Sequence, residues 1–330
     1  MKIKKGDNII VIAGKDRGKT GTIFRTLPKQ DKVAVIVARG NIVDGKQKAG
    51  RIGGDSTAAL LKKARLNPDV KAVVLRIDSG GGSMFASEVI RNEVLAVKEA
   101  GKPVIASMGS VAASGGYWIA MSADEIWAAP STITGSIGVF GTILTFENSL
   151  NSIGIYSDGV ATTELNNISL SRGISDKLSQ VFQLGVENAY DKFISLVAAE
   201  RGLEKEAVDQ VAQGRVWTAT QAKEFGLIDK LGNKQDAIEA AATLAQLQEF
   251  DVITIEQTLS EKDQFLKELL GSAMISTLLE TDSNSENIFK KLSVLFGDVG
   301  VQIVEQLNIV NEFNDPNHIY TRCLTCEVAY

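Results

Sequence analysis

Residues 104–141 read VIASMGSVAASGGYWIAMSADEIWAAPSTITGSIGVFG. The apolar run Val104–Met108 predicts a β-strand, and a helix can begin just after Ser114, in the motif Ala-Ser-Gly-Gly-Tyr-Trp. A serine at a sharp bend between a strand and the first turn of a helix projects its hydroxyl among backbone N–H groups that have no partner within the helix. Ser114 is therefore a candidate nucleophile. The alternative is structural, because turns rich in Ala, Ser and Gly are also common where helices pack closely on sheets.

A second turn of the same kind precedes this one. The run Lys71–Ile77 (KAVVLRI) predicts a buried strand, and it leads through Asp-Ser-Gly-Gly-Gly-Ser, residues 78–83, into a helix expected over Met84–Ala100. Three consecutive glycines give accessible backbone N–H groups, which an oxyanion hole requires. Two such turns on neighbouring parallel strands would face one crevice, at the edge of the sheet where α/β proteins place their sites.

The rest of the chain repeats the alternation of strand and helix. Lys32–Ala38 predicts a first strand, and a helix with Asp55 or Ser56 as its N-cap follows through Arg65. Further along, we expect a strand near 155–160 and helices near 146–153, 175–201, 204–212, 218–225, 234–247 and 261–280. Strands that alternate with helices form βαβ units. The sequence therefore predicts an α/β fold with a mainly parallel sheet and flanking helices.

Composition limits the class of protein. The chain has 330 residues, 44% of them hydrophobic, which is enough for one main domain with appendages. No apolar run reaches the roughly 18 residues of a membrane span, and residues 1–30 lack the apolar core of a secretory signal, so we expect nothing here to direct export. Those 30 residues carry eight Lys/Arg against two Asp, a net of +6, which leaves −11 for the rest of a chain whose total is −5.

The basic N-terminus is expected to differ from the acidic body. Residues 1–28 read as two short strands joined by the turn Gly14–Lys19, whose lysines and arginine could neutralise phosphates. This segment resembles the opening KOW motif of a large-subunit ribosomal protein, and RNA binding is therefore one alternative function. It covers less than a tenth of the chain, and the acidic body would repel phosphate, so we do not expect nucleic acid to be the partner.

The few histidines and cysteines limit which catalytic mechanisms and metal sites the chain can have. His318 is the single histidine and lies near the C-terminus, so a Ser-His-Asp triad is not expected. The remaining mechanism for Ser114 is a Ser-Lys dyad, in which a desolvated, neutral lysine takes the serine proton. Cys323 and Cys326 form one C-x-x-C, which without a second pair is weak evidence for zinc or redox work, and we interpret it as part of a surface tail. No cofactor or metal is expected.

Three segments together resemble a known family. VVLRIDSGGGSMFASEVIRNEV, GKPVIASMGSVAASGGYWIAMSADEIWAAPSTITGSIGVFG and GRVWTATQAKEFGLIDKLG closely resemble signal peptide peptidase A, also called protease IV. The resemblance covers residues 31–330 and implies a fold similar to Clp protease and crotonase. Long members of that family contain two homologous halves, and this chain is similar to the C-terminal one.

The resemblance also implies roles for individual residues. Ser114 would be the nucleophile, and the Gly115 amide, with that of Gly81 or Gly82, would form the oxyanion hole. Ser136, in Thr-Gly-Ser-Ile-Gly, would orient the lysine. Without the family, a serine in such a sequence is more often a turn residue.

Two positions depart from the family pattern. Where the family has Ser-Pro-Gly-Gly, this chain has glycine at 80, and the loss of proline removes a constraint on φ in the oxyanion loop. In addition, the region about fifty residues after the nucleophile, where single-half members carry the base lysine, contains none between Ser157 and Ser171. Lys177 is the nearest downstream lysine, but it opens a long amphipathic helix and is a poor candidate. The general base is therefore unknown, and in long members the N-terminal half supplies it.

These observations lead to one expected organisation and function. Residues 1–30 form a basic segment, 31–282 a peptidase domain, and 283–330 a C-terminal helix and polar tail. We expect a serine endopeptidase half that cleaves hydrophobic peptides such as cleaved signal peptides, in an oligomer with lysine-bearing halves, on the outer side of an inner membrane. The alternatives are a catalytically incomplete scaffold, RNA binding through the N-terminus, and an acyl-CoA enzyme of the crotonase type, which the exposed serine fits less well.

Overall fold

The structure is a computed structural model that describes residues 31–257, apart from 144, 161–168 and 170. It also describes residues 313–323 and 326, together with 7–10, 12, 15 and 17–22 near the N-terminus. The helix expected over 261–280 lies outside the described residues, as does most of the expected C-terminal helix. No helix among the described residues is both long and apolar enough to cross a membrane.

The main sheet is built on parallel strands. Its path runs β12-β10-β8-β6-β3-β14, with β9 and β13 joined beside β8. Every pairing between its described strands is parallel except that of β10 with β12. The strands are β3 (Lys32–Arg39), β6 (Val70–Ser79), β8 (Val104–Ala113), β9 (Glu125–Ala128), β10 (Ile133–Gly135), β12 (Val216–Thr218), β13 (Lys230–Leu231) and β14 (Asp251–Thr254). The expected α/β fold with a mainly parallel sheet is confirmed.

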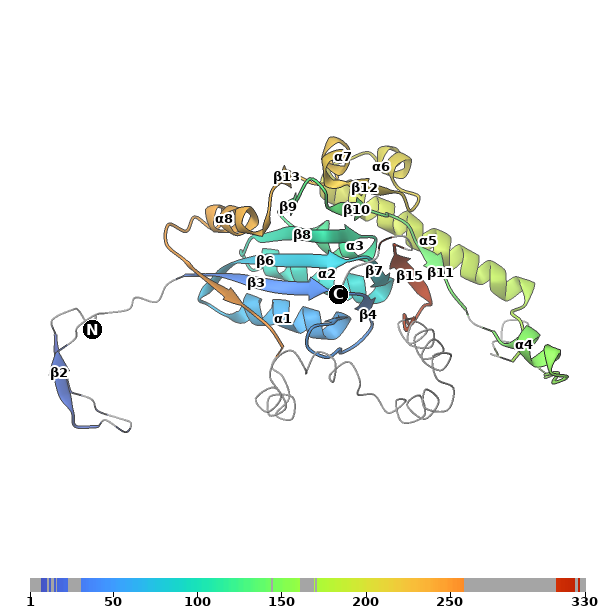
Figure 1. The fold of residues 1–330 in the computed structure, drawn as a ribbon, viewed down its shortest axis with the longest axis horizontal. Helices are drawn as coiled ribbons and strands as arrows, with labels where there is room; N and C mark the ends of the chain where they lie inside the picture. The colour runs from blue at the N-terminus through green and yellow to red at the C-terminus, as the bar shows by residue number, and fades with distance from the viewer. Residues whose placement is uncertain are drawn as a thin grey trace, which may run out of the picture.

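Helices cover both faces of this sheet (Figure 1). Alternate residues of β3 and β6 point to opposite faces, because side chains alternate along a strand. On one face, Ala34, Ile36 and Leu75 join the larger core with α1, α2, α3 and α5. On the other, Val33, Val35, Ala72 and Val74 pack against α8. The helices are α1 (Gly54–Leu66), α2 (Met84–Glu99), α3 (Gly115–Ala120), α4 (Glu147–Ser152), α5 (Asp176–Arg201), α6 (Lys205–Val211), α7 (Ala219–Glu224) and α8 (Lys234–Leu244).

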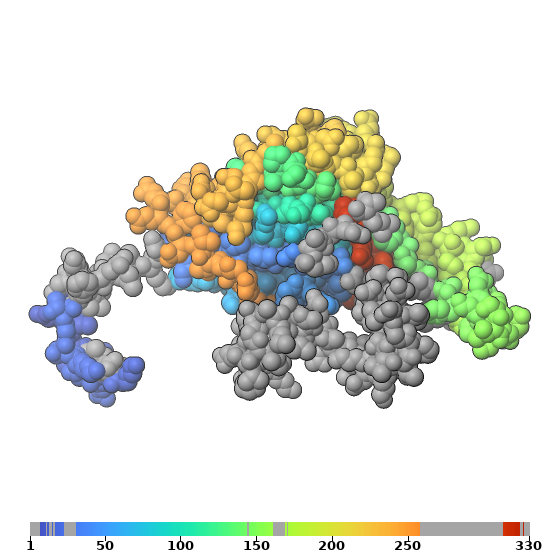
Figure 2. Space-filling view, viewed as in Figure 1, coloured from blue at the N-terminus to red at the C-terminus, as the bar shows by residue number. Residues whose placement is uncertain are grey.

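Most predicted elements are found near their expected positions, and two details are wrong. The N-cap of α1 is Gly53, not Asp55 or Ser56. Residues 155–160 form no strand and are exposed, and no strand in the described part of the chain pairs with them. Together with α4 and the first half of α5 they form an arm that projects from the body (Figures 1 and 2).

A second sheet lies beside the carboxyl ends of the main one. Its order is β11-β15-β7-β4-β5, where β15 is antiparallel to both β11 and β7. Its strands are β4 (Ile42–Val43), β5 (Ile52–Gly53), β7 (Gly81–Ser83), β11 (Phe140–Gly141) and β15 (Ile319–Arg322). A C-terminal strand thus lies between β11 and β7, inside a sheet that the sequence did not predict.

The N-terminal segment contains the expected hairpin. β1 (Asn8–Ile10) pairs antiparallel with β2 (Thr20–Thr22), and both are largely exposed. Figure 1 shows this hairpin apart from the body of the chain. The resemblance of this segment to a ribosomal KOW motif, and RNA binding by it, remain predictions.

Candidate active site

Ser114 stands at the turn between β8 and α3 in a strained conformation. Its φ is 54° and its ψ is −114°, a backbone region that residues with a side chain rarely adopt. Two hydrogen bonds fix the turn: Ser114 N–H donates to the Gly135 carbonyl at 2.8 Å, and Trp118 N–H donates to the Ser114 carbonyl at 2.8 Å. Ser114 is 1% exposed, and among the described residues its Oγ has no hydrogen-bond partner. A strained, buried and unbonded hydroxyl is a poor structural element, which favours a functional role.

The glycine turn after β6 lies against the Ser114 turn. A Cβ atom on Gly81 would come within 2.6 Å of the Gly115 amide nitrogen, and one on Gly116 would come within 2.6 Å of the Ser79 carbonyl oxygen. Gly81 also has a φ of 97°, which glycine tolerates best. The two backbone turns therefore contact each other directly. Any residue other than glycine at 81 or 116 would push them apart.

The amides of the two turns are not equivalent. Gly81 N–H donates to the Ser79 hydroxyl at 3.1 Å, so this donor is already engaged. Gly115 N–H is in the first turn of α3, where the helix itself supplies no acceptor. Gly82 is buried in β7, beside Ile42 of β4 and Thr321 of β15. The candidate oxyanion residues are thus brought together, with Gly115 next to the nucleophile in the chain.

Ser136 directly follows β10, the strand that pairs with β8. β10 runs parallel to β8 with Gly135 opposite Ala113, so the next residue of each strand is one of the two serines. Ser136 has a φ of 48°, is 5% exposed, and donates its backbone N–H to the Arg215 carbonyl at 2.7 Å. The structure brings the two serines to the same edge of the sheet.

No base is hydrogen-bonded to Ser114 Oγ in the part of the chain that the structure describes. Residues 161–168 are outside the description, and the printed sequence has no lysine there. Lys177 is in the first turn of α5, out on the arm beside α4 (Figure 1). Burial raises the pKa of Tyr117, and its hydroxyl donates to the Leu227 carbonyl at 2.8 Å, so this neighbour keeps its proton. The general base for Ser114 therefore stays unknown.

A network of charged side chains, which the sequence did not predict, binds α3 to the neighbouring helices. Trp118 Nε1–H and Arg91 Nε–H both donate to Glu88 Oε2 at 2.8 Å. Burial alone would raise the pKa of Glu88, but these hydrogen bonds and the nearby charges of Arg91 and Lys192 outweigh it and lower the pKa. The network joins α2, α3 and α5, and so holds the helix that follows the nucleophile.

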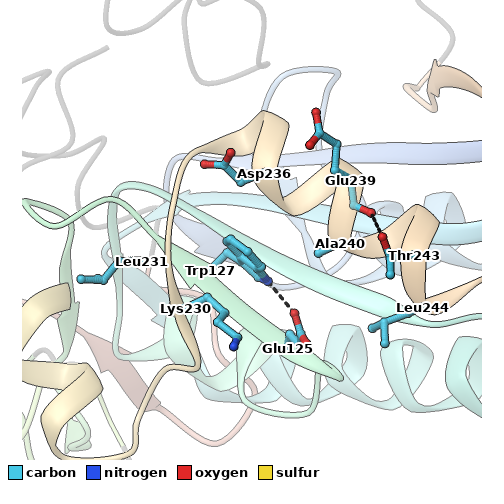
Figure 3. A pocket seen from close by; sticks show the side chains of 9 residues that line it. All are labelled: Glu125, Trp127, Lys230, Leu231, Asp236, Glu239, Ala240, Thr243 and Leu244. Atoms are coloured by element: carbon cyan, nitrogen blue, oxygen red, sulfur yellow. Dashed lines mark hydrogen bonds between the residues drawn. The ribbon is translucent and has the colours of Figure 1, made fainter.

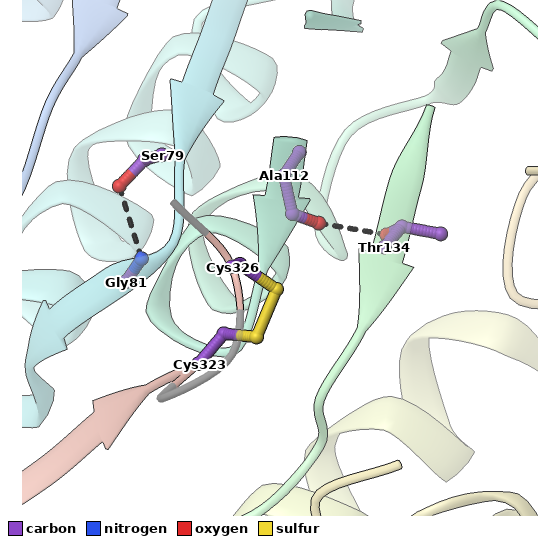
Figure 4. The surroundings of a disulfide bond; sticks show 6 residues. All are labelled: Ser79, Gly81, Ala112, Thr134, Cys323 and Cys326. Carbon is purple, nitrogen blue, oxygen red and sulfur yellow. Dashed lines mark hydrogen bonds between the residues drawn. A yellow bond between two sulfur atoms is a disulfide. The ribbon is translucent and has the colours of Figure 1, made fainter. Parts of the chain in front are cut away.

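The cysteines were interpreted as part of a surface tail, and this is wrong. Cys323 is 4% exposed, forms a disulfide with Cys326, and packs against Val111 and Ala113 of β8. Figure 4 shows the disulfide between the turn at Gly81 and the ends of β8 and β10. No group of residues that could hold a metal ion is found within the described ranges. The spacing of the two cysteines in the sequence does not indicate where in the fold they pack. Their position beside β8 could be found only from the structure.

A separate hollow lies between β9 and α8 (Figure 3). Its polar side chains are bonded locally, as when Trp127 Nε1–H donates to Glu125 Oε2 at 2.7 Å. Glu125 pairs with Ile105, near the amino end of β8, whereas Ser114 follows the carboxyl end. This hollow is therefore not part of the Ser114 site.

Known proteins match most of the chain. Residues 96–248 match Peptidase family S49. A putative protease of Synechocystis sp. is 33% identical over 269 residues, which are 80% of this chain and 92% of that protein. The chain belongs to peptidase family S49. Protease 4 of Salmonella typhi is 45% identical over 294 residues, which are 89% of the S49 chain and 46% of Protease 4, so the resemblance to the protease IV family is confirmed.

Length and structure add two further findings. The S49 chain spans about half the length of the Protease 4 sequences that it matches, at 46% and 47%. Its structure is also similar to a mutant ClpP1 from Listeria monocytogenes, with 12% identity and a TM-score of 0.39, over 62% of this chain and 94% of that one.

Proposed function

We propose that this chain is the nucleophile-bearing half of a serine endopeptidase, with Ser114 as the nucleophile. The observation that carries the proposal is the strained φ of 54° at Ser114, at a turn packed against the glycine turn, in a member of peptidase family S49. A fold gains nothing from a strained serine whose hydroxyl is buried without a partner. A nucleophile, in contrast, needs a fixed and unbonded oxygen.

The reaction would be acyl transfer to serine. Ser114 Oγ attacks the peptide carbonyl carbon and gives its proton to a neutral lysine amine. The amide of Gly115, with that of Gly81 or Gly82, stabilises the oxyanion of the tetrahedral intermediate. The C–N bond then breaks, the lysine returns the proton to the leaving amine, and water hydrolyses the Ser114 ester. Ser136 would accept a hydrogen bond from the lysine and orient it.

A second peptidase half would supply the lysine. The stretch from Ser157 to Ser171 has no lysine, and the chain spans about half the length of Protease 4. The arm of α4, residues 155–160 and the first half of α5 offers a surface for such a partner. Several large apolar side chains of the arm are exposed in the described structure: Phe146, Ile153, Ile155, Tyr156, Val160, Val181 and Leu184. Docking through this arm would bury apolar surface and complete the dyad.

The substrates would be hydrophobic peptides, such as cleaved signal peptides, met at a membrane. This follows from the resemblance to signal peptide peptidase A, whose substrates lie in that environment. The same resemblance supports a place on the outer side of an inner membrane, in an oligomer of several halves.

A serine-directed fluorophosphonate tests the proposal. The purified chain is labelled alone and with an added lysine-bearing N-terminal half, beside a Ser114→Ala control. We expect strong labelling only with the added half, and none in the control. Labelling of the chain alone would mean that a base exists within it or across a homo-oligomer. No labelling under either condition would favour a catalytically incomplete scaffold.

A further inference from the structure

Residues 213–218 lie directly against the turn that carries Ser136. They include β12, which pairs antiparallel with β10. Beyond the paired residues, Ser136 N–H donates to the Arg215 carbonyl at 2.7 Å, and Gly214 N–H donates to the Ile137 carbonyl at 3.0 Å. The backbone around Ser136 is therefore bound on this side by a segment from a much later part of the sequence.

The turn at Ser136 depends on its surroundings because two consecutive residues have a positive φ. The values are 81° at Gly135 and 48° at Ser136. Glycine adopts this conformation readily, but a residue with a side chain keeps it only where the surrounding structure holds it there. The Gly135 carbonyl also accepts the Ser114 N–H at 2.8 Å, so the same turn contacts the nucleophile's backbone.

The Trp217 side chain packs against this turn. A Cβ atom on Gly135 would come within 2.8 Å of Trp217 Cδ1, so the indole ring contacts the backbone of the turn directly. The ring is itself fixed at two places. Its Nε1–H donates to the Val211 carbonyl, at the end of α6, at 2.8 Å, and its face meets the edge of Phe225, at the end of α7, in a T-shaped contact of 4.8 Å between centroids. A ring held in this way can keep the turn from relaxing.

The glycines around Ser136 fit the same contact. The motif Thr-Gly-Ser-Ile-Gly, residues 134–138, has glycine at both positions that meet residues 213–218. Gly135 lies against Trp217, and a Cβ atom on Gly138 would come within 2.9 Å of the Gly214 nitrogen. A side chain at either glycine would push the two segments apart. The Ser136 motif and residues 213–218 therefore pack as one unit.

We propose that Trp217 is a positioning residue of the Ser114 site, and that it acts by holding Ser136 in its positive-φ conformation. The proposal rests on the proposed function, in which Ser136 accepts a hydrogen bond from the lysine amine and orients it. When the indole ring is removed, the turn relaxes and the Ser136 hydroxyl moves. The lysine is then less well aligned with Ser114 Oγ, and proton transfer becomes slower.

The test compares two tryptophans, in the chain mixed with the lysine-bearing half. Trp217→Leu removes the ring from the Ser136 turn. Trp127→Leu is the matched control, because Trp127 is also partly buried and donates its Nε1–H, but lies at the hollow between β9 and α8. We expect the rate of fluorophosphonate labelling of Ser114 to fall about tenfold or more in Trp217→Leu, and to stay within about twofold of the parent in the control. Trp217→Phe keeps a ring beside Gly135 and should recover most of the rate.

A Ser136→Ala background separates positioning from a general loss of stability. If Trp217 acts through Ser136, adding Trp217→Leu to Ser136→Ala should lower the labelling rate by less than about twofold, because the hydroxyl that it positions is already absent. An equal fall in both backgrounds would overturn the proposal, as would unchanged labelling of a folded Trp217→Leu variant. Circular dichroism checks folding, and Trp217→Met, which keeps more apolar volume, replaces the leucine variant if that variant does not fold.

Amide hydrogen exchange tests the turn without any chemistry. The N–H groups of Ser136 and Ser114 donate to the Arg215 and Gly135 carbonyls. Trp217→Leu should therefore speed exchange at these two amides, while the amides of β3 and β6 keep the parent's protection. Unchanged exchange at Ser136 would show that Trp217 does not hold the turn, and the proposal would be wrong. If exchange rises but no variant is labelled, the parent included, the proposed serine chemistry is wrong while Trp217 still holds the turn.

Discussion

Thr321 and Ser114 bear the two buried side-chain hydroxyls that lack a hydrogen-bond partner among the described residues. They are far apart in the sequence, yet both lie next to Gly115: Ser114 in the chain, and Thr321 through space. Unbonded buried hydroxyls are rare because each one loses its bonds to water without replacement. Their presence on both sides of one helix start favours a functional role for this place over a purely structural one.

Ser114→Ala should make the protein more stable. The substitution removes a buried, unbonded hydroxyl, and we expect the free energy of unfolding to rise by about 1 kcal/mol. Thermal unfolding should show this as an increase in Tm of about 2 °C. Ser110→Ala, at an exposed position before the turn, is the control and should change stability by less than about 0.5 kcal/mol. A clear loss of stability in Ser114→Ala would indicate a structural hydroxyl.

Gly81→Ala should displace the C-terminal strand. The new Cβ would meet the Thr321 carbonyl oxygen and the Gly115 amide nitrogen, at a φ of 97°. We expect a loss of at least about 2 kcal/mol in urea unfolding. Gly101→Ala measures the loss of stability that comes from a positive φ alone. Gly101 also has a positive φ, 78°, but open space surrounds it. It should lose only about 1 kcal/mol, and equal losses would show that the close approach at Gly81 is unimportant.

Glu88→Gln should change how stability depends on pH. The pKa of Glu88 is lower in the folded chain than the ordinary value of about 4.3, so its charged form stabilises the fold above that pH. This contribution is lost as the pH falls through the lowered pKa. The variant should be less stable than the parent at pH 7, and should lose less stability between about pH 5 and pH 3. Denaturant unfolding at several pH values measures this, with Glu206→Gln at an exposed position as the control.

Lys102→Met should destabilise the end of α1. Lys102 Nζ donates to the carbonyls of Ala64 at 3.0 Å, Arg65 at 2.7 Å and Asn67 at 2.7 Å. The ammonium adds a charged donor to carbonyls at the end of the helix, where backbone donors are few, so we expect a loss of about 2 kcal/mol when it is removed. Lys62→Met, exposed on the same helix, should have little effect in the same urea titration.

Leu184→Lys should prevent the docking of a second half. Leu184 is 64% exposed on the arm, and a charge there would oppose burial in an interface. Labelling of Ser114 in the presence of the lysine-bearing half should fall at least tenfold. Leu244→Lys, 45% exposed on α8 and away from the arm, should label like the parent. Equal labelling of both variants would place the partner elsewhere.

Local sequence patterns were enough to predict most strands of the main sheet and the helices that cover it. The apolar run that became β6 and the long helix with Ser175 as its N-cap were predicted nearly to their observed ends. The candidate site was also accessible, because glycines and a serine at the ends of parallel strands predict turns that meet at one edge. The strand expected near 155–160 failed, because a β-type pattern forms a strand only where a partner strand is available.

The sequence by itself determined the α/β architecture, the family and the place of Ser114, since each depends on residues close together in the chain. Only the tertiary structure decided what covers that serine. β15 reaches β7 and β11 through backbone hydrogen bonds, which almost any sequence can make, and Asp315 meets Ser83 across most of the chain. Such contacts leave no periodic pattern to find, because they depend on where two distant segments meet in space.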